Sequence, residues 1–111
     1  MLQTVTFQAP AFDAATLYTE VRWNVAAFTT ATASWFSVTT ALSTGVVAFQ
    51  YSVDGLVWAQ LLDTDGGSVT FSADGDSKLI DLSGINWVRV RVTTLQASVI
   101  GVAALHCKTD A

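Results

Sequence analysis

The feature that most constrains this chain is an alternation with a period of two residues, in which β-branched and aromatic residues are interleaved with small polar ones. Side chains point to opposite faces of a strand in turn, so this period is typical of strands that bury one face. Clusters of turn residues recur about every 8 to 12 positions, the spacing expected of sandwiches and barrels. Segments with a helical period are almost absent. The pattern predicts an all-β fold.

We expect an antiparallel β-sandwich of the jelly-roll type, with about eight or nine short strands. A chain of 111 residues can form one core but cannot give each of two domains its own, so residues 1–111 are taken as one domain. Residues 1–13 are expected to form a docking arm or an edge strand. A helical turn is expected within Ala11–Thr19, after Pro10. The expected strands are Leu2–Phe7, Glu20–Phe28, Ala33–Leu42, Val46–Val53, Leu56–Leu62, Ser68–Ala73, Lys78–Leu82, Trp87–Leu95 and Ser98–Lys108.

The alternation also predicts a hairpin and the faces of two strands. Asp54-Gly55 separates two apolar runs and suits a tight reversal that needs a positive φ. Further Asp- and Gly-rich clusters follow, so residues 46–82 are expected to form an antiparallel meander. The side chains expected to face the core from these two strands are Val47, Phe49, Tyr51, Val53, Val88, Val90 and Val92.

The low charge of the chain limits its partners. Only 13% of the residues are charged, and the net charge is −4 with five lysines and arginines. Nucleic-acid binding depends on clustered cations, so it is not expected. The longest apolar stretches are too short to span a bilayer, and the N-terminus lacks the basic start and apolar run of a secretory signal. We expect a soluble protein without a membrane partner, not exported by the usual route.

One long segment carries no charge at all. No Asp, Glu, Lys or Arg occurs from Trp23 to Val53, although this segment includes more than one expected strand. Natural monomers usually place charges on outer faces and edges, where they discourage association. The outer positions here hold Ser, Thr, Ala and Asn. We expect this surface to contact neighbouring subunits; a plain solvated face is the alternative.

The sequence offers no arrangement for catalysis. His106 is the only histidine and Cys107 the only cysteine. As neighbours on one strand they point to opposite faces, so they cannot act together as base and nucleophile. They are also too few for the four ligands of a zinc site. We expect a protein that is not an enzyme, binds no cofactor and has no intrachain disulfide.

Two acidic turns are the weak candidates for a metal site, because carboxylates converging across a hairpin can bind calcium. An EF-hand is excluded: counted from the first aspartate, Gly67 stands where a ligand is required and Ser68 where a glycine is required. Two interpretations remain. One is an irregular calcium site, and the other is an ordinary turn in which Asp hydrogen-bonds to the local backbone and Gly allows a positive φ. The four aspartates are Asp63, Asp65, Asp74 and Asp76.

The four tryptophans differ in their surroundings. Trp23 shares its face with two valines and is expected in the core. Trp35 falls on the face opposite Phe36, so we expect it to point outward or to lie at an interface. Trp58 follows the turn on a strand with two apolar faces and is interpreted as packing. Trp87 shares its face with two arginines that could stack on its ring. Exposed aromatic rings can also hold sugars, which leaves glycan binding open.

The sequence resembles a known group of proteins in two stretches. FQYSVDGLVWAQL contains the turn Ser-x-Asp-Gly-x-x-Trp, and INWVRVRVTTLQASVIGVAAL contains a late Trp-x-Arg-x-Arg-Val strand. Together with the Ala/Thr/Ser-rich WNVAAFTTATASWFSVTTALSTGVVAF, they resemble small β-sandwich structural proteins of tailed bacteriophage virions, over roughly residues 20–105. The same turn also occurs in discoidin-like carbohydrate-binding sandwiches.

This resemblance implies a non-enzymatic virion protein, most simply a capsid decoration (cement) protein that stabilises the shell through subunit contacts. The expected partners are further copies of the chain, as a homotrimer, and the major capsid or other virion proteins. A carbohydrate-binding module of a tail or fibre, using Trp35, Trp58 or Trp87 with acidic turns and calcium, is the alternative. Arginine binds carboxylates bidentately and is enriched at interfaces. The expected interface residues are Arg22, Trp35, Trp87, Arg89 and Arg91.

Overall fold

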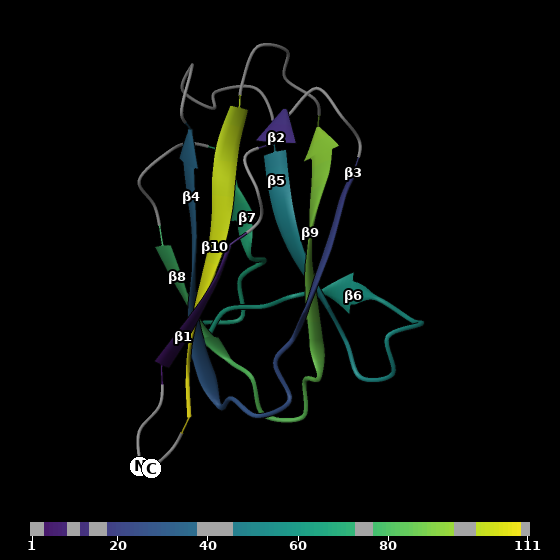
Figure 1. Cartoon of the computed structure of the whole chain (residues 1–111), viewed down its shortest axis with the longest axis vertical. Helices are drawn as coiled ribbons and strands as arrows, with labels where there is room; N and C mark the ends of the chain where they lie inside the picture. The colour runs from purple at the N-terminus through teal and green to yellow at the C-terminus, as the bar shows by residue number, and fades with distance from the viewer. Residues whose placement is uncertain are drawn as a thin grey trace.

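The computed structural model of the chain describes residues 4–8, 12–13, 18–37, 46–72, 77–94 and 100–109. These residues form ten strands in two antiparallel sheets that face each other as two layers (Figure 1). The described residues include no helix, and so none that could cross a membrane. The strands are β1 (Thr4–Gln8), β2 (Phe12–Asp13), β3 (Tyr18–Asn24), β4 (Thr30–Ser37), β5 (Val46–Ser52), β6 (Ala59–Gln60), β7 (Thr70–Phe71), β8 (Ser77–Asp81), β9 (Trp87–Thr94) and β10 (Ile100–Lys108).

The two sheets are wound from one long hairpin. β1 pairs with β10, β3 with β9, β4 with β8 and β5 with β6, so each pair is nested inside the previous one. Successive pairs go to alternate sheets. The first sheet has the order β1-β10-β4-β8 with β2 also on β10, and the second has β3-β9-β5-β6 with β7 also on β5. This winding is that of a jelly roll, and it confirms the expected antiparallel β-sandwich.

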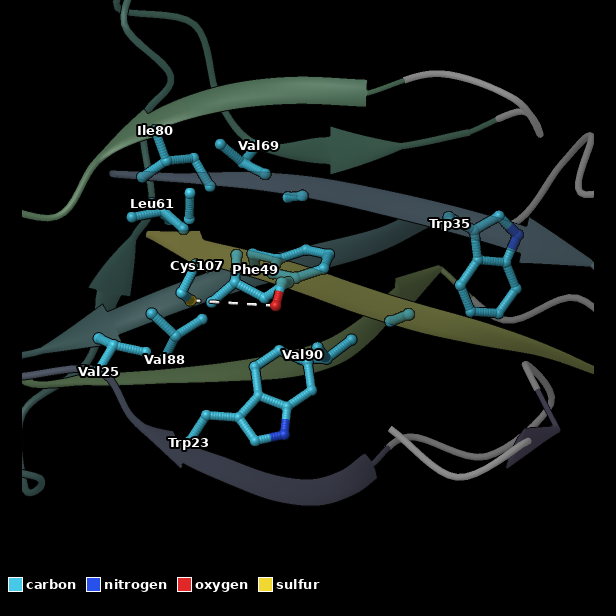
Figure 2. Close-up of a cluster of buried hydrophobic side chains, with 14 of the residues drawn as sticks. Trp23, Val25, Trp35, Phe49, Leu61, Val69, Ile80, Val88, Val90 and Cys107 are labelled. Carbon is cyan, nitrogen blue, oxygen red and sulfur yellow. Dashed lines mark hydrogen bonds between the residues drawn. The ribbon is translucent and has the colours of Figure 1, made fainter. Parts of the chain in front are cut away.

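The core fills the space between the inner faces of the sheets (Figure 2). Phe49 has its ring centroid 6.2 Å from that of Trp23 and 5.7 Å from that of Phe71. Aromatic pairs at such distances contribute about 0.5–1.5 kcal/mol each beyond simple burial. The alternation placed these residues correctly on the inner faces: the buried side chains include Trp23, Val47, Phe49, Val88 and Val90.

Trp35 is buried, contrary to the sequence prediction. It is 0% exposed, whereas its neighbour Phe36 is 58% exposed. The inner face of β4 otherwise carries alanines, so the indole fills space that these small side chains leave. Gly101 of β10 completes the cavity, because a Cβ on it would lie 2.2 Å from Cζ2 of Trp35. Figure 2 shows this tryptophan at one end of the core, away from Phe49.

Several local predictions need correction. The strand Leu56–Leu62 shortens to β6 with an isolated bridge at Leu62, and the reversal is a wide loop instead of a tight turn. Val53 is 59% exposed because β5 ends one residue earlier. The described part of Ala11–Thr19 is strand and not a helical turn.

The meander prediction is wrong at its last strand. β6 and β7 both pair with β5, but β8 pairs with β4 in the opposite sheet. The alternation tells which face of a strand is buried, and it does not tell which sheet the strand joins. The continuation of the expected strand Ala33–Leu42 beyond Ser37 lies outside the described residues.

Candidate functional site

The most exposed apolar side chains of the described chain lie on the loop between β5 and β6. Leu56 is 83% exposed and Val57 74%. Figure 1 shows this loop projecting from the body of the sandwich beside β6. Large apolar side chains held in water on a convex loop are typical of a contact surface. We call residues 53–58 the apolar loop.

The apolar loop is fixed by hydrogen bonds at its base. Oδ1 of Asp54 accepts from the backbone N–H of Leu56 at 2.8 Å and of Val57 at 3.0 Å. The hydroxyl of Ser52 donates to Oδ1 of Asp54 at 3.0 Å and accepts from the N–H of Gly55 at 2.8 Å. Gly55 has φ 80°, a conformation that favours glycine. The Ser-x-Asp-Gly pattern therefore preorganises the loop.

Trp58 closes the loop against the outer face of the second sheet. The guanidinium carbon of Arg89 lies 4.3 Å from the indole centroid and that of Arg22 5.6 Å. Nε of Arg89 also donates to Oε1 of Gln50 at 2.7 Å. These side chains meet because Arg22, Arg89 and Gln50 are paired in register across three strands. Each cation–π contact at such a partly exposed site contributes about 0.5–1 kcal/mol.

Two residues at the start of β9 support the loop from below. The side-chain amide of Asn86 donates to the carbonyl of Val53 at 2.8 Å. The indole of Trp87 lies under Gly55, where an added Cβ would be 3.5 Å from its Nε1. Trp87 is therefore half-buried by the chain itself. The loop therefore packs on arginine and tryptophan side chains of the outer face of the second sheet.

The structure unites some of the predicted interface residues and separates others. Arg22 and Arg89 meet on Trp58, whereas the face that Trp87 shares with Arg89 and Arg91 predicts stacking on Trp87. Arg91 lies on the same outer face, paired with Ala48, and is exposed. Trp35 is excluded from any surface. The regular strand predicted over Leu56–Leu62 does not indicate that Leu56 and Val57 are exposed; the Ser-x-Asp-Gly turn just before them is the signal that does.

The ionisation of Asp54 should control the order of the apolar loop. The backbone N–H groups of Val57 and Leu56, and then the Ser52 hydroxyl, hold the pKa of Asp54 below its usual 3.8. A depressed pKa means that the carboxylate stabilises the fold above about pH 3.8 and that this support is lost as the pH falls through the lowered value. In an NMR titration, the amide signals of Leu56 and Val57 should move together with a midpoint below pH 3.8. The variant Asp54→Asn should lack this transition, and a midpoint at or above 3.8 in the unmodified protein contradicts the assigned hydrogen bonds.

A second exposed apolar surface lies on the outer face of the first sheet. Phe36 and Leu79 are 58% and 62% exposed. Thr32 stands between Leu79 and His106 in register, and Nδ1 of His106 lies 3.0 Å from Oγ1 of Thr6. The neighbouring outer positions include Thr30 and the buried small side chains Ser34 and Ala104, and the charged Asp81 and Lys108 lie in register beside Thr30 at one end. We call this surface the low-charge face. Its strand β4 belongs to the charge-free segment identified in the sequence.

In the acidic turn that the structure describes, the aspartate side chain accepts hydrogen bonds from backbone N–H groups of the same turn. Oδ1 of Asp63 accepts from the N–H of Asp65 and of Gly67, both at 2.9 Å. Within the described ranges no group of three metal-ligating side chains occurs. Asp74 and Asp76 lie outside those ranges. The geometry at Asp63 is that of an Asx-type turn.

His106 and Cys107 point to opposite faces, as the alternation predicts. His106 is exposed on the low-charge face, whereas Cys107 is 0% exposed in the core. Burial raises the pKa of the Cys107 thiol to about 11. Its Sγ lies 3.9 Å from the carbonyl oxygen of Leu105, a weak contact drawn in Figure 2. A buried thiol with a raised pKa is a poor nucleophile.

Comparison with known proteins finds similarity of fold alone. No family model and no curated protein sequence matches the chain. Among solved structures, the SPBc2 prophage-derived protein YomS superposes with a TM-score of 0.72 at 13% identity, over 96% of this chain and 95% of YomS. The PBSX exported protein XepA superposes with a TM-score of 0.75 at 9% identity, over 97% of this chain and 38% of XepA. The chain thus shares its fold with nearly the whole of one solved chain and with part of another.

Proposed function

We propose that this chain is a non-enzymatic structural protein of a bacteriophage, and specifically a capsid decoration protein that binds the shell as a homotrimer. The observation that carries the proposal is the low-charge face, where Phe36 and Leu79 stand exposed and the outer positions of β4 between them, Thr32 and Ser34, are small and uncharged. A rigid sheet of this kind suits a flat contact with another protein. The fold shared with two prophage-derived proteins and the sequence resemblance to virion sandwiches support a phage origin.

In this proposal the protein binds by burying the exposed apolar side chains of the low-charge face against the shell, and the contact is repeated over many copies. Covering one large apolar side chain contributes about 1.5–3 kcal/mol before ordering costs are subtracted. A single contact of this size is weak, but a trimer that binds three equivalent positions gains avidity. Because the face lies on regular strands, it loses little conformational freedom on binding. The protein then stabilises the shell by joining neighbouring subunits.

Glycan binding draws less support from the geometry. Trp35 is buried, and the indole of Trp58 has the Arg89 guanidinium over its ring. Trp87 is half-buried beneath Gly55. Sugar recognition of the stacking kind needs an open aromatic face. Protein contact remains the function that these surfaces support best.

Binding to the shell should depend on the low-charge face. We expect the purified protein to saturate undecorated capsids of its own phage at a fixed ratio, and the double variant Phe36→Asp/Leu79→Asp to bind at least about 100-fold more weakly, since it buries two unpaired charges. Sedimentation of capsids with labelled protein measures both. Ala26→Asp/Ala27→Asp serves as the matched control, because it adds the same two charges at exposed positions outside the low-charge face and the apolar loop. Equal binding by the double variant, or tryptophan quenching by glycans in its place, overturns the proposal.

A further inference from the structure

A groove next to the apolar loop combines apolar walls with carboxylates. It has a volume of about 450 Å³ and runs between the end of β5, the segment after β6 and the turn between β8 and β9. Its apolar walls include Tyr51, Leu62 and Ile85, and its acidic groups are Asp63 and Asp81. Leu62 is 50% exposed at the rim. A groove of this size accepts a few side chains of a partner.

Both carboxylates of the groove have fixed positions. Oδ1 of Asp81 accepts from the N–H of Ser83 at 2.9 Å, and Oδ1 of Asp63 accepts from two turn N–H groups. The hydrogen bonds from Ser83 also lower the pKa of Asp81, so it stays ionised near neutral pH. The groove therefore presents negative charge beside exposed apolar surface. A complementary partner needs apolar side chains with cations next to them.

The apolar loop of the same chain has this complementary composition. Leu56 and Val57 form its exposed tip, and the guanidinium groups of Arg22 and Arg89 lie at its base on Trp58. Three of the five cationic residues, these two and Arg91, belong to this outer face. Charge complementarity of this kind fixes the register of an interface. The chain thus carries two surfaces of complementary composition, the apolar loop and the groove.

We propose that the apolar loop of one copy docks into the groove of a second copy, with Leu56 and Val57 against Leu62 and Ile85 and the arginines beside Asp63 and Asp81. The proposal rests on the homo-oligomer of the proposed function and names the surfaces that form it. Within one molecule the tip does not fill the groove, because Leu56 remains 83% exposed. Each copy gives one loop and receives another, so the contact can repeat around a closed ring.

A second copy suits the loop better than a lipid surface. The ionised carboxylate of Asp54 sits at the base of the loop, within hydrogen-bond distance of the N–H groups of Leu56 and Val57. Insertion of the tip into a bilayer brings this charge toward the hydrocarbon, which is costly, and anionic headgroups repel it. A loop already fixed by its own hydrogen bonds loses little conformational freedom when it docks into a groove. The area is small, so association should be weak and should increase with protein concentration.

Complementation between two defective variants tests the contact. Leu56→Asp/Val57→Asp removes the apolar tip of the loop and leaves the groove unchanged. Leu62→Lys places a charge in the groove and leaves the loop unchanged. Analytical ultracentrifugation should show that the unmodified protein associates, and that each variant alone associates at least about 30-fold more weakly. The two variants mixed should form a one-to-one complex, because one intact loop then meets one intact groove. Leu79→Asp, on the low-charge face, should associate like the unmodified protein.

Three results on self-association overturn the docking. They are an unmodified protein that stays monomeric over the whole concentration range, variants that associate normally, and a mixture that forms no complex. Binding of the protein to phosphatidylglycerol vesicles that is lost with Leu56→Asp/Val57→Asp assigns the loop to lipid, and also overturns it. Normal self-association combined with no binding to capsids contradicts the proposed function alone, so the two failures can be told apart.

Discussion

Replacing Gly101 with alanine should cost the fold about 3 kcal/mol or more, as a crowded insertion into a packed core. An added Cβ would lie 2.2 Å from Cζ2 and 2.5 Å from Cη2 of Trp35, and 2.8 Å from the carbonyl oxygen of Phe36. The backbone carbonyl cannot move without disturbing the pairing of β10 with β4. Chemical denaturation should show a lower midpoint with little change in slope.

A second variant shows whether the indole is the cause. Trp35→Phe removes the ring atoms nearest to the added methyl group, so Gly101→Ala should cost less in that background than in the unmodified chain. The neighbouring change Val102→Ala, at a half-buried outer position, serves as a mild control. If Gly101→Ala unfolds at the same midpoint as the unmodified protein, the close packing of β10 against Trp35 is wrong.

Truncating Trp35 should destabilise the protein far more than truncating Phe36. Trp35→Ala removes a side chain with no exposed surface and should cost about 3–5 kcal/mol. Phe36→Ala removes a ring that is 58% exposed and should change stability by about 0.5 kcal/mol or less. The pair compares adjacent aromatic residues on one strand, measured by the same denaturation experiment.

Reversal of that order would show that β4 presents its other face to the core. Because a shift of one residue exchanges the two faces of a strand, every inner position of β4 would then be wrong. Ala33 supplies an independent check. It is fully buried, so Ala33→Leu should be destabilising through overpacking, while Thr32→Leu, at the next outer position, should be tolerated.

The sequence was sufficient for the fold class and for the faces of the most regular strands. In β9 the valines alternate with arginines, and a strand with charges on one side has only one way to face a core. In β4 this signal is missing, because Trp35 and Phe36 are both apolar and no charge marks the outer face. Assigning Phe36 to the core places Trp35 outside, whereas the space for the indole is left by Gly101, on a strand distant in the sequence.

The apolar loop could be predicted only in part. Ser52, Asp54 and Gly55 indicate a turn, and Gly55 has the positive φ that the pattern requires. The sequence does not show that Asp54 binds two N–H groups beyond the glycine and so opens the turn into a loop. Nor does it show that Arg22, from β3, reaches Trp58, since that contact depends on the order of strands in the sheet. Contacts between distant segments follow from topology, which a local pattern does not contain.

The two proposals assign the molecule two separate contact surfaces, the low-charge face and the apolar loop. The first belongs to the β4 sheet, and the second projects beside β6 in the other sheet. A decoration protein needs both kinds of contact, one to the shell and one to its own copies. The variants described above separate them, because each replaces residues on one surface only.

The most direct test of the account is the amount of this chain in purified particles of its own phage, measured by quantitative mass spectrometry. A decoration protein should be present at a fixed ratio to the major capsid protein, and particles grown with Phe36→Asp/Leu79→Asp should lack it. Particles that contain none of the unmodified chain, while infected cells contain it in quantity, would contradict a structural role in the virion.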